Sequence, residues 1–299
     1  MAVTAGRFEL FIRQRLGALS RTLPSARAGE ITSVHQARVA TRRLREALPL
    51  ITRGSALRKH RRRVRRLTRA LGPVRELDVA LLTLDEFAGT PEVPRAGVQA
   101  LRQAIRQERT RMQVDLRRTI DRTRLPKLSA KLAAAAEKRD KESPGPRSVD
   151  PKQLAAARDR AAHRAERLRI RIENAAAIYL PERLHEVRIA AKKLRYAMEI
   201  VRDLSRSRAT ARILTLKRAQ DLLGRIHDLE VLIARTRAIQ GSSNAPTLRV
   251  SADMDLLVRR LETECRRLHG RYIAMRAPLL TICDHVTGAH ASRHREPAA

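Results

Sequence analysis

Along most of the chain, a set of mostly apolar positions recurs at alternating intervals of three and four residues. In residues 34–51 they step 3, 4, 3, 4, 3, and residues 184–201 take the same steps. This spacing is typical of the buried face of an amphipathic helix. No run of strict alternation is long enough to predict a strand, so the sequence predicts an all-α protein.

Clusters of Pro, Gly and Ser interrupt the helical pattern and predict loops. They lie at residues 88–94, 143–151 and 241–246. The strongest cluster falls at mid-chain and predicts a linker between a first helical half, residues 1–142, and a second, residues 152–285. Residues 286–299 are predicted to form a disordered tail.

Individual residues predict several helix ends. Thr32 or Ser33 is suited to capping the helix that follows, and Pro181 suits a first helical turn. The Leu-Gly-Pro sequence at residues 71–73 predicts the end of one helix and the start of another. Pro49 predicts a helix that kinks or ends nearby.

Two segments occur twice, in the same order and at nearly the same separation. Residues 34–45 read VHQARVATRRLR and residues 184–195 read LHEVRIAAKKLR, an offset of 150. Residues 71–79 read LGPVRELDV and residues 223–231 read LGRIHDLEV, an offset of 152. A repeat of this length predicts two duplicated helical bundles, because solenoid units have shorter periods.

Each copy of the first segment carries a histidine and three basic residues on one side of its helix. At about 100° per residue they fall within about 80°, beside the apolar stripe. Charges in that position can face a groove between helices. The members are His35, Arg38, Arg42 and Arg45 in the first copy and His185, Arg188, Lys192 and Arg195 in the second.

The helix after the first copy is also strongly basic. Lys and Arg occupy eight of the positions 58–69, and no acid lies among them. Like charges four residues apart destabilise an isolated helix by a few tenths of a kcal/mol each, and Arg62 and Arg66 are such a pair. Several like-charged pairs of this kind occur in the basic helices, which predicts a counter-charge from outside the chain. A solvated basic face remains the alternative.

The composition points to a polyanionic partner. The 299 residues include 64 Lys and Arg against 31 Asp and Glu, a formal net charge of +33. A surface of this charge repels itself and attracts polyanions. Hydrophobic residues make up 43% of the chain, enough for real cores, whereas aromatic residues make up only 2%. The cores are therefore expected to consist of Leu, Ala, Val and Ile, which suits helices better than sheets.

Cysteine use and hydropathy predict a soluble cytoplasmic protein. Cys265 and Cys283 are too few for a disulfide scaffold and fit a reducing compartment. No run of residues approaches the length of a membrane span, and residues 1–16 lack the uninterrupted apolar core of a signal peptide.

His35 and His185 each lie in the first turn of a predicted helix. Backbone N–H groups and the helix dipole favour anions there, which predicts a phosphate contact; a packed or surface histidine is the alternative. Lys and Arg are expected to keep their charge between about pH 5.5 and 8, so the histidines are expected to supply any pH dependence.

No metal site is predicted. His185 and Glu186 are not followed by the second histidine of an H-E-x-x-H helix. The late segment that carries both cysteines, His269 and His285 has no recognised ligand spacing.

The four repeated segments resemble the duplicated signature of the CHAD family, the conserved-histidine α-helical domain. The resemblance covers roughly residues 5–285. It implies two four-helix-bundle-like halves related by a pseudo-twofold, with basic helices lining a central groove. It also implies binding of inorganic polyphosphate, often at polyphosphate granules.

The resemblance assigns candidate polyphosphate-binding residues position by position. They are His35, Arg38, Arg42, Arg43, Arg45, Arg65, Arg66, His185, Arg188, Lys192, Lys193, Arg195, Tyr196, Lys217 and Arg218. The basic run that follows the first copy adds Lys59, Arg62 and Arg69. The family's usual Arg-Asp pair appears as Arg75–Glu76 in one half and His227–Asp228 in the other. The two halves are therefore not expected to bind equally.

The predicted function is non-enzymatic binding of polyphosphate, without a cofactor. Non-specific nucleic-acid binding is one alternative, because phosphate contacts alone permit it, but few aromatics are present for base stacking. A phosphate-handling enzyme or a metal-binding accessory domain is the second alternative. It would need clustered carboxylates or an activated nucleophile, and the acids near the motifs are scattered singly.

Overall fold

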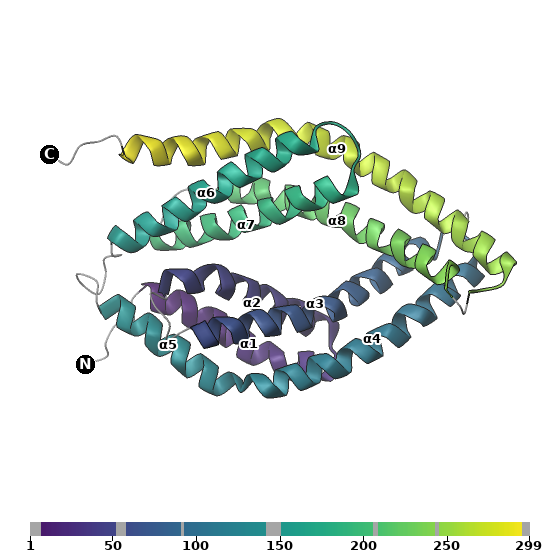
Figure 1. Ribbon diagram of the computed structural model, residues 1–299, viewed down its shortest axis with the longest axis horizontal. Helices are drawn as coiled ribbons and strands as arrows, with labels where there is room; N and C mark the ends of the chain where they lie inside the picture. Colours follow the sequence, from purple (N-terminus) through teal and green to yellow (C-terminus); the bar gives the residue numbers. More distant parts are fainter. Residues whose placement is uncertain are drawn as a thin grey trace.

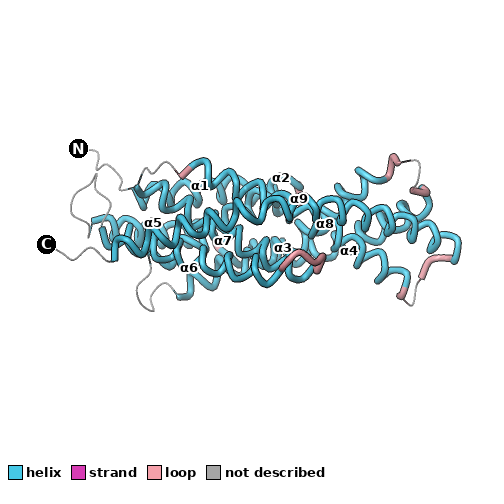
Figure 2. The backbone as a smooth tube through the Cα atoms, turned by 90° about the horizontal axis from the view of Figure 1, so that it is seen from above, coloured by secondary structure: helices cyan, strands magenta, loops and turns pink. Residues whose placement is uncertain are grey.

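The computed structural model describes residues 7–51, 58–90, 93–141, 151–205, 209–242 and 245–294. In these residues all regular structure is helical, which confirms the all-α prediction (Figures 1 and 2). The helices are α1 (Arg7–Ala28), α2 (Ile31–Ile51), α3 (Arg58–Phe87), α4 (Arg95–Thr123), α5 (Leu125–Lys141), α6 (Pro151–Ala175), α7 (Pro181–Ser205), α8 (Thr210–Gln240) and α9 (Leu248–His294).

The helices form two bundles that meet along an elongated molecule. Figure 1 shows α1, α2 and α5 in the lower bundle and α6, α7 and the end of α9 in the upper one. The long helices α3, α4, α8 and α9 extend from the bundles and converge at the far end. α2 and α7, which carry the two copies of the histidine segment, face each other across the boundary between the bundles.

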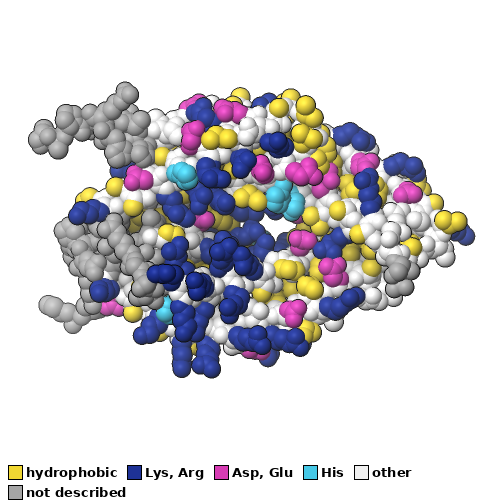
Figure 3. Space-filling model, viewed as in Figure 1, with side chains coloured by type: hydrophobic (Ala, Val, Ile, Leu, Met, Phe, Trp, Pro, Cys, Tyr) yellow, Lys and Arg dark blue, Asp and Glu magenta, His cyan; other side chains and the backbone are white. Residues whose placement is uncertain are grey.

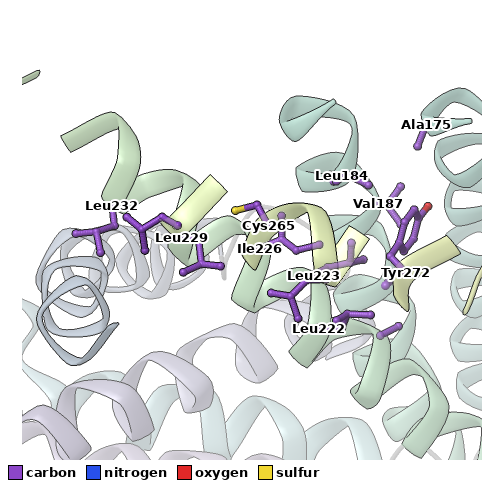
Figure 4. Close-up of a cluster of buried hydrophobic side chains, with 14 of the residues drawn as sticks. Ala175, Leu184, Val187, Leu222, Leu223, Ile226, Leu229, Leu232, Cys265 and Tyr272 are labelled. Atoms are coloured by element: carbon purple, nitrogen blue, oxygen red, sulfur yellow. The ribbon is translucent and has the colours of Figure 1, made fainter. Parts of the chain in front are cut away.

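Two hydrophobic cores hold the fold together, and their boundary does not follow the mid-chain linker. The first core joins α1, α2 and α5 with residues 64–74 of α3, and it includes Leu116 of α4, Ala157 of α6, and Ile200 and Leu204 of α7. The second joins α6 to α9 with residues 77–87 of α3 and residues 98–105 of α4 (Figure 4). Because α3 contributes to both cores, it fixes the two bundles relative to each other.

The apolar stripes predicted for α2 and α7 are buried. These positions are Val34, Ala37, Thr41, Leu44 and Leu48 in α2 and Leu184, Val187, Ala191, Leu194 and Met198 in α7. Val201 is partly buried, and the side chain of Ile51 lies outside the described part. Each helix therefore turns its basic row to one side of a packed face.

The predicted helix ends hold in part. α7 begins at Pro181, as expected, and α2 is described as far as Ile51, two residues after Pro49. The prediction of a break at residues 71–73 is wrong, because α3 continues through Pro73. Pro73 has no backbone N–H, so the helix lacks one hydrogen bond at this point. Leu71 and Val74, on either side of Pro73, are buried, and their burial holds the helix together.

The cap of α2 also differs from the prediction. Glu30, rather than Thr32 or Ser33, supplies the side-chain acceptor at this helix start. Its carboxylate oxygens accept hydrogen bonds from the backbone N–H groups of Thr32 at 2.9 Å and Ser33 at 2.7 Å. Gly29, with φ of 98°, makes the turn that precedes it.

The C-terminal end of the structure differs from the sequence prediction as well. α9 runs to His294 and so includes residues 286–294, where a disordered tail was expected. Residues 295–299 and most of the predicted linker lie outside the described part. Along the described residues, we find no helix with the length and apolar character needed to cross a bilayer.

Candidate functional site

The basic rows of α2 and α7 lie next to each other. We call His35, Arg38, Arg42, His185, Arg188 and Lys192 the central basic row. The charges of Arg38 and Arg42 act on Lys192 across the bundle boundary, and that of Arg42 also acts on Arg188. Figure 3 shows an opening near the middle of the molecule with Lys and Arg side chains along its edge. The fold thus joins residues 150 positions apart into one surface.

Lys192 is the most perturbed cation of this row. Its side chain is buried, with the residue only 9% exposed. Burial, followed by the charges of Arg188, Arg42 and Arg38, lowers the pKa of Lys192 to about 6. Near pH 7 the amine is therefore mostly neutral in the free protein. The expectation that every Lys and Arg keeps its charge between pH 5.5 and 8 is wrong at this position.

The glycines of the second repeated segment make room for the arginines of the first. Arg38 crosses to α3, where its Nη1 donates a hydrogen bond to the carbonyl oxygen of Thr68 at 3.1 Å. A Cβ on Gly72 would lie 2.8 Å from that Nη1, and a Cβ on Gly224 would lie 3.6 Å from Nε of Arg188. Burial lowers the pKa of Arg38 to about 10, which reflects how closely it is enclosed.

Alanine substitutions at these glycines are expected to differ. Gly224→Ala should raise the free energy of unfolding by about 0.5–1 kcal/mol, because alanine suits a helix interior better and 3.6 Å is an ordinary contact. Gly72→Ala should gain less stability and weaken anion binding, because its methyl group displaces Arg38. Urea denaturation and binding assays on both variants test this. Equal effects of the two substitutions would contradict the assigned contact.

The two motif histidines have different neighbours. In the second half, Nδ1 of His185 and Nδ1 of His227 lie 3.1 Å apart, so one ring donates and the other accepts. Burial and Arg188 lower the pKa of His227 to about 3 and also lower that of His185. In the first half, burial followed by the charge of Arg75 lowers the pKa of His35. In the sequence, Arg75 and His227 stood out only in the comparison with the family's usual Arg-Asp pair.

Asp228 supplies negative charge beside the row. Burial raises the pKa of the Asp228 carboxyl, whereas the positive charges of Arg188 and Arg75 lower it. An acid on α8 thus interacts with cations on α7 and α3. Asp228 is a residue that sequence reasoning did not include in the site, although it lies in the second repeated segment.

Arg43, Arg195 and Tyr196 are engaged in contacts within the protein. Nη1 of Arg195 donates to Oε1 of Glu199 at 2.7 Å, and its Nε donates to Oε1 of Gln220 at 3.0 Å. Nε of Arg43 lies 3.3 Å from the other carboxylate oxygen of Glu199. The Arg195 guanidinium lies 4.7 Å from the centre of the buried Tyr196 ring. These contacts tie α7 to α2 and α8.

Comparison with known proteins identifies the family. A family model of the CHAD domain matches residues 11–237, about three quarters of the chain. The chain belongs to the CHAD family. The crystal structure of the CHAD domain from the plant Ricinus communis matches with a TM-score of 0.60 and 21% identity, covering 100% of this chain and 95% of that chain. This likeness concerns the fold. A comparison with curated proteins finds no match.

Arg45 and Lys193 extend the basic surface of this CHAD protein toward α3 and α6. Burial lowers the pKa of Arg45. The charge of Glu46 raises this pKa, and the charges of Arg65 and Arg69 on α3 lower it further. Burial and Arg164 of α6 lower the pKa of Lys193. Glu46 is already paired, because its Oε2 accepts a hydrogen bond from Nη2 of Arg160 at 2.9 Å.

The remaining predicted residues lie elsewhere. Lys59, Arg62 and Arg66 line a separate cavity between α3 and α4. Lys217 and Arg218 are exposed on α8, where Nζ of Lys217 lies 4.0 Å from Oδ2 of Asp221. Within the described part of the chain, no hydrogen bond or ion pair joins these five residues to the central basic row.

The cysteines are buried and free, and burial raises the pKa of each thiol to about 11. In the described residues, no three His, Cys, Asp or Glu side chains lie close enough together to hold a metal ion. The arrangement around the row is therefore suited to holding anions by charge and hydrogen bonding.

Proposed function

We propose that this CHAD protein binds inorganic polyphosphate at the central basic row. The observation that carries the proposal is the crowding of Arg38, Arg42 and Lys192 without an ion-pair partner among the described residues. Arg38 and Arg42 are partly buried like charges whose repulsion a bound anion would neutralise, and the same anion would favour the charged form of Lys192. A phosphate chain offers about one negative charge per unit, and each guanidinium can donate two hydrogen bonds to phosphate oxygens.

The acids near the row favour binding over catalysis. Glu199 pairs with Arg43 and Arg195, Glu46 pairs with Arg160, and Asp228 is a single carboxylate. Phosphoryl transfer generally requires a group of carboxylates that hold metal ions, or an activated nucleophile. These donors fit neither arrangement, and we infer a non-enzymatic binding protein.

Nucleic acid is the competing ligand, because its phosphates would interact with the same cations. Single-stranded nucleic acid gains much of its affinity from base stacking on aromatic rings. The aromatic ring that accompanies the row, Tyr196, is 5% exposed and covered by Arg195. A ligand without bases therefore fits better.

Competition binding distinguishes the two ligands. Unlabelled long-chain polyphosphate and single-stranded DNA would each displace labelled polyphosphate, at matched phosphate concentration and fixed salt. We expect polyphosphate to compete at a much lower phosphate concentration. Equal competition per phosphate would replace the proposal with non-specific polyanion binding. Granule association in cells, which we propose as the consequence, is tested by co-localisation with stained polyphosphate.

Polyphosphate is expected to raise the melting temperature of the protein. Ligand at a hundred times its Kd stabilises the folded state by about 2.7 kcal/mol, and relief of self-repulsion adds to this. Thermal scans at low salt, with and without saturating polyphosphate, measure the shift. An unchanged melting temperature would indicate loose association with a charged surface instead of a folded site.

A further inference from the structure

A second basic cavity lies where the first turns of α3 meet the last turns of α4. Its volume is about 300 Å³. Four residues of α3 and three of α4 form its walls. They are Lys59, Arg62, Arg63, Arg66, Thr119, Arg122 and Thr123. Five of these seven side chains are cationic, and none is acidic or aromatic.

The five cations of this cavity lack counter-charges. Within the described residues, none of them forms an ion pair or a hydrogen bond. The nearby acids of α4 are engaged elsewhere: Asp121 pairs with Arg27 at 2.7 Å, and Asp115 lies 3.5 Å from Arg118. Arg118 on α4 and Arg27 on α1 thus have acidic partners, whereas the cations lining the cavity have none among the described residues.

The cavity is distinct from the central basic row. Arg65 and Arg69 of α3 act on Arg45 of α2, toward the row. Arg62 and Arg66 turn toward α4 instead. Successive helical residues are rotated by about 100°, so one basic run supplies two separate faces. The sequence had assigned all of these residues to a single site.

The second half of the chain repeats the cations of this cavity only in part. At the offset of 152 that relates the second motif segments, Lys59, Arg62 and Arg63 correspond to Ala211, Leu214 and Thr215, whereas Arg66 corresponds to Arg218. Three of the four α3 cations therefore lie outside the duplicated pattern. Their presence on one half alone requires an explanation other than the paired rows of α2 and α7.

We propose that this cavity binds a compact inorganic phosphate compound of two or three linked phosphate groups, independently of the chain held at the central basic row. A volume of about 300 Å³ is at the lower end of ordinary ligand pockets, which favours a small ligand. Arginines on two walls can hold several phosphate oxygens at once. No aromatic side chain is present to stack on a base, so the phosphates themselves are the recognised group.

The hydroxyl groups add polarity to the α4 wall. Oγ1 of Thr123 donates its hydrogen bond to the carbonyl oxygen of Thr119 at 2.7 Å. The hydroxyl of Thr119 makes no hydrogen bond with a described residue and remains available as a donor to a phosphate oxygen. Arg122 lies on the same wall, so the ligand would be held from both helices.

Tripolyphosphate binding by the full-length protein tests this site. Isothermal titration should be performed on a variant with Arg42→Glu and Lys192→Glu, in which the central basic row is disabled. We expect one molecule of tripolyphosphate to bind still. Adding Arg62→Gln with Arg66→Gln should weaken that binding at least about tenfold, as expected when charge-assisted hydrogen bonds are lost.

Two further variants make the outcome decisive. Arg259→Gln with Arg271→Gln removes the same charge from an exposed surface of α9 and should leave tripolyphosphate affinity nearly unchanged. Arg122→Gln changes the opposite wall of the cavity and should also weaken binding, which guards against a folding defect in the α3 variant. Circular dichroism verifies that each variant is folded.

Three results would overturn the proposal. One is the absence of tripolyphosphate binding when the row is disabled. Another is unchanged affinity in folded variants of both walls. The third is equal loss of long-chain polyphosphate binding in cavity and row variants, because the cavity would then be part of one extended site. Whether the central basic row binds polyphosphate is tested separately, by measuring long-chain polyphosphate binding in variants with an intact cavity.

Discussion

Replacing Arg42 and Lys192 together by glutamate is expected to lower the affinity for long-chain polyphosphate by at least about a hundredfold. Hydrogen bonds to charged groups contribute about 1.5–3 kcal/mol each, and two such contacts are lost in this variant. The new carboxylates would also repel the ligand. Titration of labelled polyphosphate at fixed salt measures the change.

The fold is expected to tolerate this double substitution. Lys192 lies among Arg38, Arg188 and Arg195, with Asp228 as an opposing charge. A carboxylate at this position gains several cationic neighbours, whereas the amine has mainly like charges around it. Far-ultraviolet circular dichroism and the melting temperature should stay close to those of the parent protein. Unchanged affinity in such a folded variant would rule out the central basic row as the site.

A matched control separates local contact from overall charge. Arg259→Glu with Arg271→Glu makes the same change in net charge on an exposed part of α9. Its effect on affinity should be small and should vanish as salt rises, because exposed charges are screened. An equal loss of affinity in the control would mean that only net charge matters.

Affinity for polyphosphate is expected to fall by up to about tenfold per pH unit as the pH rises from about 6.5 to 8. The pKa of Lys192 is about 6 in the free protein, against an ordinary value of 10.5. Bound phosphate favours the charged amine and raises that pKa. Between the two values, binding takes up one proton, so affinity decreases with rising pH. Below pH 6 the amine is already charged, and the dependence should flatten.

The histidines are expected to contribute little in this range. Burial lowers the pKa of His227 to about 3, and burial together with arginines lowers those of His35 and His185. These shifts move the titration of the rings further below the range from pH 6.5 to 8. We therefore assign the pH dependence to Lys192 instead of to the histidines, which the sequence alone had favoured.

Two variants assign the pH dependence to its source, at constant ionic strength. Lys192→Arg keeps a group that stays charged, so the slope between pH 6.5 and 8 should largely disappear while binding persists. His35→Gln with His185→Gln should keep most of the slope. A slope that survives Lys192→Arg and is lost with the histidines would contradict the role given to Lys192.

The sequence by itself determined the helices, their buried faces and the family. Burial of Val34, Leu44, Leu184 and Leu194 follows directly from their spacing, because the period of an α-helix is a local property. The loops rich in Pro and Gly could also be predicted, because the turn preference of these residues is a local property as well. Pro73 was the exception, since burial against distant helices kept α3 continuous.

Only the tertiary structure decided how the basic residues are grouped. It set Arg42 beside Arg188 and Lys192, engaged Arg43 with Glu199, and turned Arg62 away toward α4. A pKa depends on which charges and how much protein surround a group, and those neighbours come from helices far apart in the chain. The repeat in the sequence therefore identified the cations, whereas packing determined which of them share a site and which one loses its charge near neutral pH.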